Sequence, residues 1–356
     1  MCYNISMKEE QLTQNLGNNF YTEDVRTLQY DEIAGTTIVE TFDWIKGYDI
    51  EKELDASLVV KDQANSSSCG GQAWATYGEV LEAISTKTKE ERSAKFIYAQ
   101  TAVVGGGSDG LSNSKLVAKK GWGTEALTPS YPATEENLTR KADITQRAYE
   151  NALKARAGVY TQGSGLMDTL DIDEFALAVQ KNHGAILGIA GYNNGTWLSY
   201  YPTPVTKQPW ANYWRHWVYV GKAEMIDGKK GFWILNSWGK NCGKNGWQWL
   251  SEDWFSAKSS TGISLVWASF FLSYLPQEEW HHTFSLTLRK GSRNAEVKAL
   301  QHALYLQGMF SDKEDGIFGK ITQASVKAFQ KRYSLIADGI VGRNTNNKLN
   351  SIYSQL

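Results

Sequence analysis

The stretch that decides the fold is Lys61-Asp62-Gln63-Ala64-Asn65-Ser66-Ser67-Ser68-Cys69, in which a glutamine stands six residues before a cysteine. From the cysteine onward, apolar residues recur at helical spacing at Ala73, Tyr77, Val80, Leu81 and Ile84. The sequence therefore predicts a helix over residues 69–85. At its N-terminus the helix dipole is expected to lower the pKa of the thiol. The amide of Gln63 could donate a hydrogen bond to a developing oxyanion. For a single cysteine, the alternative is a buried structural residue.

Two features downstream favour a reactive thiol over a structural one. His216 opens the apolar run 217–220 and follows the cysteine by 147 residues (216 − 69). Asn236-Ser237-Trp238-Gly239 comes directly after the apolar run 232–235. An asparagine oxygen can accept the imidazole N–H and fix its tautomer, and an adjacent tryptophan can cover that bond from water. A nucleophile, a base and a group that orients the base are the parts that covalent catalysis requires.

The glycine-rich segment 105–110 is predicted to be a loop, because three consecutive glycines do not hold a helix or a strand. Such a loop lets another backbone approach closely, so Gly106 and Gly107 are candidate contacts for a peptide substrate. An ordinary surface turn is the alternative. No Gly-Lys-Ser/Thr sequence follows, and we therefore reject a phosphate-binding loop.

Helical patterns come first in the chain and short apolar strands come later. The expected helices are 50–54, 69–85, 112–120, 135–157 and 174–181, the last capped by Asp173, and the expected strands are 185–189, 217–220 and 232–235. This order predicts an α+β domain with a helical lobe, an antiparallel β lobe and a cleft between them. Residues 1–40 are polar and weakly patterned, and we interpret them as an N-terminal lead-in.

A separate module is expected at the C-terminus, beyond a polar linker over residues 276–287. From residue 288, three short helical patterns follow, and the signature Asp-Gly-Ile-x-Gly occurs twice, at 315–319 and 338–342. The copies are 23 residues apart (338 − 315), which is too close for a solenoid repeat. We interpret them as two matched turns with an apolar plug that hold a three-helix module together.

Composition excludes several classes of function. The net charge of −1 provides no electrostatic basis for binding nucleic acid or an anionic membrane. With three cysteines and no CxxC pair, we expect neither a disulfide framework nor a zinc site, and no metal or cofactor. The sequence shows no signal peptide and no apolar run of membrane-spanning length. We expect synthesis in the cytoplasm and, by default, a monomer.

The region 41–275 resembles the papain-like cysteine peptidases. In that family a glutamine stands six residues before the catalytic cysteine, a glycine pair binds substrate backbone, a histidine opens a strand and an Asn-Ser-Trp motif follows. The resemblance implies that Cys69 is the nucleophile, that His216 is the general acid/base and that Asn236 orients the imidazole. It implies that Gln63 and the Cys69 N–H stabilise the oxyanion, and that Trp238 shields the His216–Asn236 pair from water. Gly106 and Gly107 would contact the substrate backbone.

Three departures from the family pattern bear on substrate preference and pH range. Gly70 follows the nucleophile where the family usually has an aromatic residue, and the family's disulfide cysteines are absent. Arg215 precedes the histidine, where a cation could lower the imidazole pKa. Cys242, in a glycine- and asparagine-rich loop, is interpreted as uninvolved in the chemistry.

The region 288–356 resembles the type 1 peptidoglycan-binding domain, on its two Asp-Gly-Ile-x-Gly turns and the helices between them. Together the two resemblances imply a cysteine endopeptidase that the C-terminal domain holds on bacterial peptidoglycan. Its substrate would be a protein or peptide; alternatives are an endopeptidase for peptidoglycan cross-bridges and an inactive wall-binding protein. The enzyme would act at the cell wall or extracellularly after release, from a phage or a bacterium.

Overall fold

A computed structural model describes residues 27–28, 41–162, 171–276, 282–307, 309–310 and 312–353. The chain divides into two compact units, one ending at Pro276 and the other beginning at Gln277. Apart from residues 27–28, the expected lead-in over residues 1–40 lies outside the described residues. The two units are described separately below.

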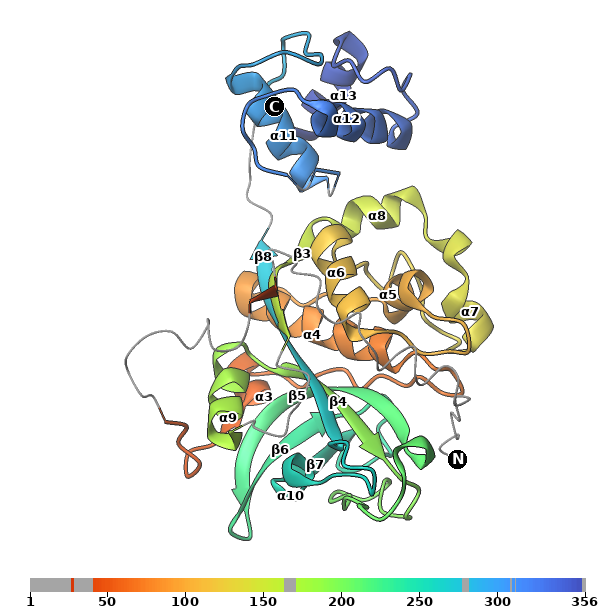
Figure 1. Cartoon of the computed structure of the whole chain (residues 1–356), viewed down its shortest axis with the longest axis vertical. Helices are drawn as coiled ribbons and strands as arrows, with labels where there is room; N and C mark the ends of the chain where they lie inside the picture. Colours follow the sequence, from red (N-terminus) through yellow and green to blue (C-terminus); the bar gives the residue numbers. More distant parts are fainter. Residues whose placement is uncertain are drawn as a thin grey trace. The chain divides into compact units, whose positions relative to one another are not determined.

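One curved, mainly antiparallel sheet forms half of the first unit (Figure 1). In its described part the strand order is β1-β3-β8-β4-β5-β6-β7, with β2 paired to β5. The strands are β1 Thr27–Leu28, β2 Tyr48–Asp49, β3 Ala155–Gln162, β4 Ala185–Gly191, β5 Trp214–Ile226, β6 Lys229–Leu235, β7 Trp247–Ser251 and β8 Val266–Pro276. Only the β1–β3 pair is parallel among the pairings described.

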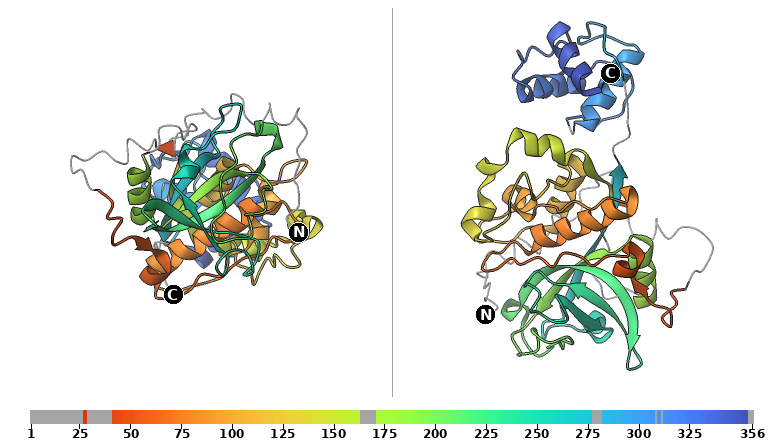
Figure 2. Two further views of the ribbon diagram at one scale, coloured as in Figure 1. Left: turned by 90° about the horizontal axis from the view of Figure 1, so that it is seen from below. Right: turned by 180° about the vertical axis from the view of Figure 1, so that it is seen from behind.

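Helices form the rest of this unit, and Figures 1 and 2 show most of them gathered on one side of the sheet. Two helices, which contribute Phe175 and Trp254, instead pack into the core on the other face of the sheet. They are α3 Ile50–Leu54, α4 Cys69–Thr86, α5 Ala94–Thr101, α6 Gly110–Lys120, α7 Glu135–Thr139, α8 Gln146–Ala152, α9 Ile172–Lys181 and α10 Asp253–Ser256. The predicted division into a helical lobe and an antiparallel β lobe is confirmed.

Helix α4 is the element that joins the two lobes. It packs against α5 on one side and against β5 and β8 on the other. All fourteen residues from Cys69 to Glu82 are buried, including polar residues such as Gln72 and Glu79. The helix is therefore buried on every side rather than along one apolar stripe, and it places its first residue deep between the lobes.

Some predicted elements differ from the structure. The single helix expected over 135–157 is two short helices, α7 and α8, and β3 already begins at Ala155. Helix α9 starts earlier than expected, and its cap is Asp171, whose carboxylate accepts the N–H groups of Asp173 and Glu174. The cap expected at Asp173 is therefore wrong, because that residue already lies inside the helix.

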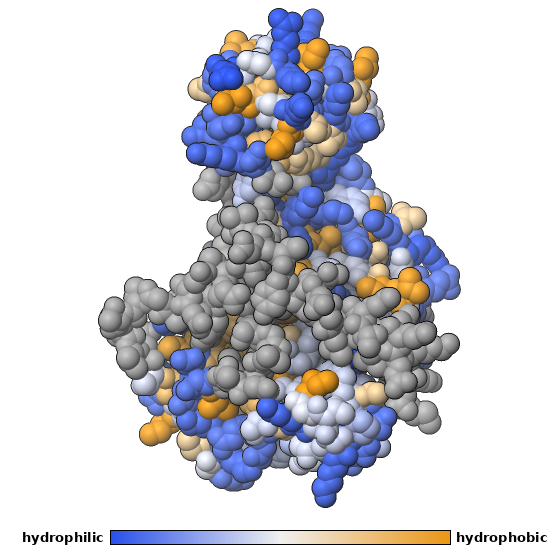
Figure 3. Space-filling model, in the orientation of Figure 1, coloured by the Kyte–Doolittle hydropathy of each residue, from blue (hydrophilic) through white to orange (hydrophobic). Residues whose placement is uncertain are grey.

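The second unit contains three helices in its described part, α11 Ala295–Leu306, α12 Lys320–Arg332 and α13 Arg343–Tyr353. The expected linker over residues 276–287 is partly wrong. Pro276 ends β8, and Phe284 is buried in the core of the second unit, where its N–H donates to Asn350 Oδ1 at 2.6 Å. Figure 3 shows a mainly hydrophilic face on this unit with scattered apolar residues.

The same pair of side-chain hydrogen bonds holds each of the two matched turns of this unit. The Gln301 side chain donates to Asp315 Oδ1 at 2.8 Å and accepts the Gly316 N–H at 2.8 Å. Gln330 makes the same pair of bonds to the second turn, to Asp338 and Gly339. The apolar plugs of the two turns are Phe318 and Val341, which are buried. Each turn is thus tied to the helix before it by one buried glutamine.

Candidate active site

Cys69 is the first residue of α4 and is buried between α4 and β5. Burial raises the pKa of its thiol to about 11, against the opposing effect of backbone N–H donors at Trp217, Gly70 and Cys69 itself. The lowered pKa expected from the helix N-terminus alone is therefore wrong, because desolvation outweighs the helix dipole and the N–H donors together. With this pKa the Cys69 thiol is mainly protonated at neutral pH.

Strand register brings His216 and Asn236 together. β5 and β6 are antiparallel neighbours that pair Tyr219 with Leu235, so the residue after β6 lies beside the start of β5. His216 Nε2 is 2.9 Å from Asn236 Oδ1. The Ser237 N–H also donates to this oxygen, at 2.8 Å, which identifies it as the amide's acceptor end.

The tautomer of the histidine follows from that bond. Because Asn236 Oδ1 accepts, Nε2 of His216 carries the proton and Nδ1 is left as the basic nitrogen. The other end of the Asn236 amide donates to Gln248 Oε1 at 2.7 Å, and Gln248 in turn donates to the Trp197 carbonyl at 2.6 Å. The orienting amide is thus itself held from behind by a buried side chain.

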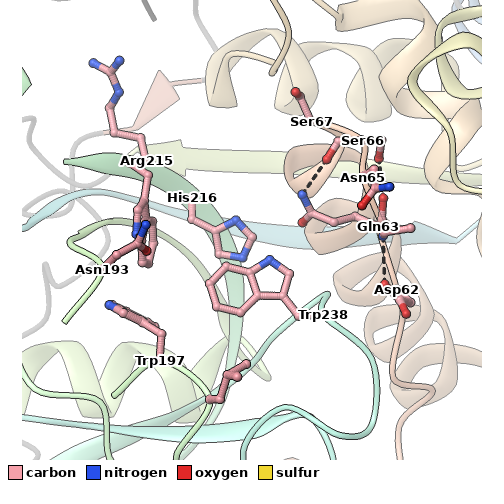
Figure 4. Close-up of a pocket in the computed structure, with 13 residues that line it drawn as sticks. Asp62, Gln63, Asn65, Ser66, Ser67, Asn193, Trp197, Arg215, His216 and Trp238 are labelled. Atoms are coloured by element: carbon pink, nitrogen blue, oxygen red, sulfur yellow. Dashed lines mark hydrogen bonds between the residues drawn. The ribbon is translucent and has the colours of Figure 1, made fainter. Parts of the chain in front are cut away.

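Trp238 covers the His216–Asn236 pair. Its ring is stacked on the imidazole, with centroids 4.7 Å apart and planes 25° apart (Figure 4). Burial lowers the pKa of His216 to about 4, although the Asn236 hydrogen bond acts to raise it. Arg215 is not among the causes of this shift, and Figure 4 shows its guanidinium pointing away from the imidazole. The histidine is therefore neutral, and able to act as a base, at neutral pH.

Gln63 is held beside the same motif. The segment around Asp62 pairs antiparallel with Trp238, and the Gln63 N–H donates to the Ser237 carbonyl at 2.8 Å. Its side-chain Oε1 accepts from Ser237 Oγ at 2.7 Å, and its Nε2 donates to the Ser66 carbonyl at 2.8 Å. These two bonds fix the amide orientation and leave the second N–H of Nε2 for a further acceptor.

Gln63, His216 and Trp238 line one pocket of about 310 Å³. The remaining lining residues are Asp62, Ala64, Asn65, Ser66, Ser67, Asn193, Trp197, Leu198, Trp214 and Arg215. One wall is the polar loop before Cys69, and the opposite wall is aromatic (Figure 4). A peptide lying here would have its reacting carbonyl near an amide donor and a neutral imidazole.

Gly106 and Gly107 do not line this pocket but adjoin the loop beside it. Both have a positive φ, +93° and +85°, a backbone conformation that residues other than glycine rarely adopt. A Cβ on Gly106 would lie 2.7 Å from Ser67 Oγ, so the glycine loop is packed against the residues before Cys69. Its conformation is compatible with the expected role in contacting substrate backbone.

Two residues that support the site were not identified from the sequence. Ser237 stands inside the Asn-Ser-Trp motif, and this position was the available signal. It bonds to both Asn236 and Gln63. The role of Gln248 could not be inferred from the sequence, because a glutamine in an apolar strand shows its role only when its hydrogen-bond partner across the sheet is known.

Two side chains closely surround Gly70, the residue after Cys69. A Cβ on Gly70 would lie 2.3 Å from Ser108 Oγ and 2.7 Å from Asn113 Nδ2, so a larger residue would have to displace these two side chains. The aromatic ring nearby belongs to Trp74, whose centroid is 5.3 Å from that of Trp217. Cys242 is buried, and its Sγ lies 3.6 Å from the Trp197 carbonyl oxygen.

Neither a metal cluster nor a membrane helix is found in the described residues. No three His, Cys, Asp or Glu side chains among them gather where they could hold a metal ion. Of the helices in the same described ranges, none combines the length and apolar character that crossing a membrane requires.

Known proteins resemble each of the two units. Residues 293–349 match the family described as "Putative peptidoglycan binding domain". A spore cortex-lytic enzyme of Halalkalibacterium halodurans is 32% identical over 88 residues, which are 24% of this chain and 27% of that protein. The match thus spans about a quarter of the length of this curated relative.

Solved structures share the fold of the larger unit. The digestive procathepsin L2 proteinase of Tenebrio molitor superposes with a TM-score of 0.53 at 16% identity, covering 71% of this chain and 76% of that one. The ragweed Amb a 11 cysteine protease, in its proform, superposes with a TM-score of 0.50 at 20% identity, covering 67% of each chain. The protein therefore has the papain-like cysteine protease fold in its larger unit and a region of the peptidoglycan-binding family at its C-terminus.

Proposed function

We propose that the protein is a cysteine endopeptidase with Cys69 as nucleophile and His216 as general acid/base. Asn236 orients the imidazole, Gln63 and the Cys69 N–H stabilise the oxyanion, and Trp238 shields the pair. Gly106 and Gly107 contact substrate backbone. The observation that carries this proposal is the His216–Asn236 bond, which leaves Nδ1 basic under the cover of the Trp238 ring.

Catalysis begins from a neutral thiol and a neutral imidazole. As Cys69 Sγ attacks the carbonyl carbon, its proton moves to Nδ1 of His216, and the carbonyl oxygen becomes an oxyanion. The oxyanion collapses, the C–N bond breaks, and the imidazolium returns the proton to the leaving amine. Water then attacks the thioester and gives a proton to Nδ1 of His216. The C–S bond breaks, the imidazolium returns this proton to Sγ, and the acid product leaves the re-formed thiol.

The C-terminal domain supports a location at the bacterial cell wall. A region of the peptidoglycan-binding family would hold the peptidase close to wall-associated substrate and raise its effective concentration there. The substrate is a protein or a peptide. One observation favours a second candidate, an endopeptidase for peptidoglycan cross-bridges: the partial relative is named a spore cortex-lytic enzyme. The third reading, an inactive wall-binding protein, is disfavoured by the complete set of Cys69, His216, Asn236 and Gln63.

A digestion comparison under reducing conditions tests these readings. Purified protein is given denatured casein or intact peptidoglycan sacculi, each with and without a thiol-reactive epoxide, beside the Cys69→Ala protein. Casein cleavage that the epoxide and Cys69→Ala both abolish, with intact sacculi, identifies a general protease. Thiol-dependent release of peptides from sacculi identifies a lytic enzyme. Activity that persists in Cys69→Ala contradicts the assignment of the nucleophile.

A further inference from the structure

One carboxylate connects the two loops that border Cys69. Glu135, the first residue of α7, accepts the Ser67 N–H at Oε2 (2.8 Å) and the Tyr98 hydroxyl at Oε1 (2.7 Å). The same hydroxyl oxygen accepts the Gly107 N–H at 2.9 Å. A continuous path of three hydrogen bonds thus runs from the loop before the nucleophile to the glycine loop.

The members of this path are held firmly. Tyr98 is fully buried on α5, and its ring packs with Ala133 and Leu138. Glu135 is half-buried, and no basic side chain forms an ion pair with it in the described part of the chain. A carboxylate that accepts both a backbone N–H and a phenol makes charge-assisted hydrogen bonds, which are stronger than neutral ones.

Glu135 does not activate the Cys69 thiol, so its role must be a different one. Burial is the main cause of the raised pKa of Cys69, and the negative charge of Glu135 raises it further. A carboxylate here therefore disfavours the thiolate. Its hydrogen bonds, by contrast, join segments 68 residues apart (135 − 67) and fix where the glycine loop lies relative to Ser67.

We propose that Glu135 is a positioning residue. Through Ser67 on one side and Tyr98 on the other, it fixes the spacing between the nucleophile loop and the glycine loop. Substrate backbone bound at residues 106–107 then presents its carbonyl to Cys69. This inference rests on the proposed function, because it assigns the glycine loop to substrate binding.

Four variants of the full chain test the proposal with a peptide substrate. Glu135→Ala removes both acceptors, and Tyr98→Phe removes the hydroxyl while keeping the ring in its apolar site. Glu135→Gln keeps one acceptor and can still donate to the hydroxyl. The matched control is Glu136→Ala, on the same helix, since Glu136 is exposed and pairs only with Arg140 among the described residues.

Loss of the path should weaken substrate binding rather than the chemical step. We expect KM to rise about tenfold in Glu135→Ala and Tyr98→Phe, with kcat within about twofold of the wild type. Glu135→Gln should recover most of the loss. It should also speed alkylation of Cys69 by iodoacetamide at pH 8, because the charge that disfavours the thiolate is gone.

The outcomes separate the two proposals. If the wild type hydrolyses peptides but the KM values of Glu135→Ala and Tyr98→Phe match that of Glu136→Ala, the positioning role is overturned and the proposed function stands. A fall in kcat alone, matched by an equal fall in the fraction of protein that a thiol-reactive epoxide labels at Cys69, also overturns it, because that result reports loss of active protein. If the wild type shows no thiol-dependent hydrolysis, the proposed function fails and this inference fails with it.

Discussion

At the scale of single residues, burial controls the chemistry of the site. It raises the pKa of the Cys69 thiol to about 11 and lowers the pKa of His216 to about 4. Both shifts favour the uncharged form, since a low-dielectric site disfavours either ion. Between these values both groups are uncharged, and in the proposed mechanism the proton therefore moves as the substrate is attacked.

The thiol pKa predicts how alkylation of the free enzyme depends on pH. Below pH 11 the thiolate fraction of Cys69 increases about tenfold for each pH unit. We therefore expect the rate of modification by iodoacetamide, followed by mass spectrometry of the Cys69 peptide, to rise about tenfold per unit between pH 7 and 10. A rate that is constant from pH 5 to 8 would mean instead that the thiol has already given its proton to His216.

The amide of Gln63 allows a second prediction at this scale. Its second N–H is the donor that remains for the oxyanion, because the first is used by the Ser66 carbonyl. Gln63→Ala should lower kcat by about 10² with the thiol still open to alkylation. Thermal melting checks that the fold persists. A decrease of less than threefold in a folded protein would place Gln63 outside the oxyanion hole.

At the scale of elements, a buried ion pair attaches the loop before Cys69 to α4. Lys61 Nζ lies 2.7 Å from Glu79 Oε1, and the two side chains are 4% and 1% exposed. Lys61 immediately precedes the Asp62-Gln63 segment, and its carbonyl accepts the Gly239 N–H at 3.1 Å. The pair therefore holds the loop against both the nucleophile helix and the Asn-Ser-Trp turn.

Removing one partner of this pair should be costly. Lys61→Met leaves the Glu79 carboxylate buried and unpaired, and we expect a loss of about 3–5 kcal/mol in the free energy of unfolding. The control is Lys229→Met, which breaks the exposed Lys229–Asp253 pair and should leave the free energy of unfolding nearly unchanged. Urea unfolding measures both. Equal losses in the two variants would show that the buried pair has no special role.

The sequence predicted elements well where apolar periodicity or a short motif was local. Helices α3, α4 and α6 and strands β4, β5 and β6 all overlap their predicted ranges. Strands β7 and β8 were missed because the buried polar residues Gln248 and Ser269 interrupt their apolar runs, and a strand buried on both faces shows no alternation to replace that signal.

The candidate site was predictable in its motifs and not in its environment. Gln63, Cys69, His216 and Asn236 are recognisable by residue type, order and spacing. The raised pKa of Cys69 could not be predicted from the sequence, because it depends on burial by β5, whose residues are about 150 positions away. For the same reason the hydrogen bond between Glu135 and Ser67 could not be predicted from the sequence, since it joins α7 to the loop before Cys69 through a tertiary contact.

At the scale of the whole molecule, the two units are proposed to divide the work. The unit ending at Pro276 contains the whole candidate site, and the unit beginning at Gln277 contains the region of the peptidoglycan-binding family. Deleting residues 277–356 should leave casein hydrolysis within about twofold, because no residue of the site is removed. Co-sedimentation with sacculi should be lost. Retained sedimentation would place wall binding in the larger unit.

The central claim is that Cys69 is the catalytic nucleophile, and covalent labelling tests it most directly. The wild-type protein is incubated near pH 7 with an epoxide thiol probe, and adducts are located by mass spectrometry while peptide hydrolysis is followed in parallel. Cys242, which is also buried, provides the internal comparison. We predict one adduct, on Cys69, with activity lost in proportion to labelling. Activity that survives full labelling of Cys69, or a probe that reacts with Cys242 instead, would contradict the account.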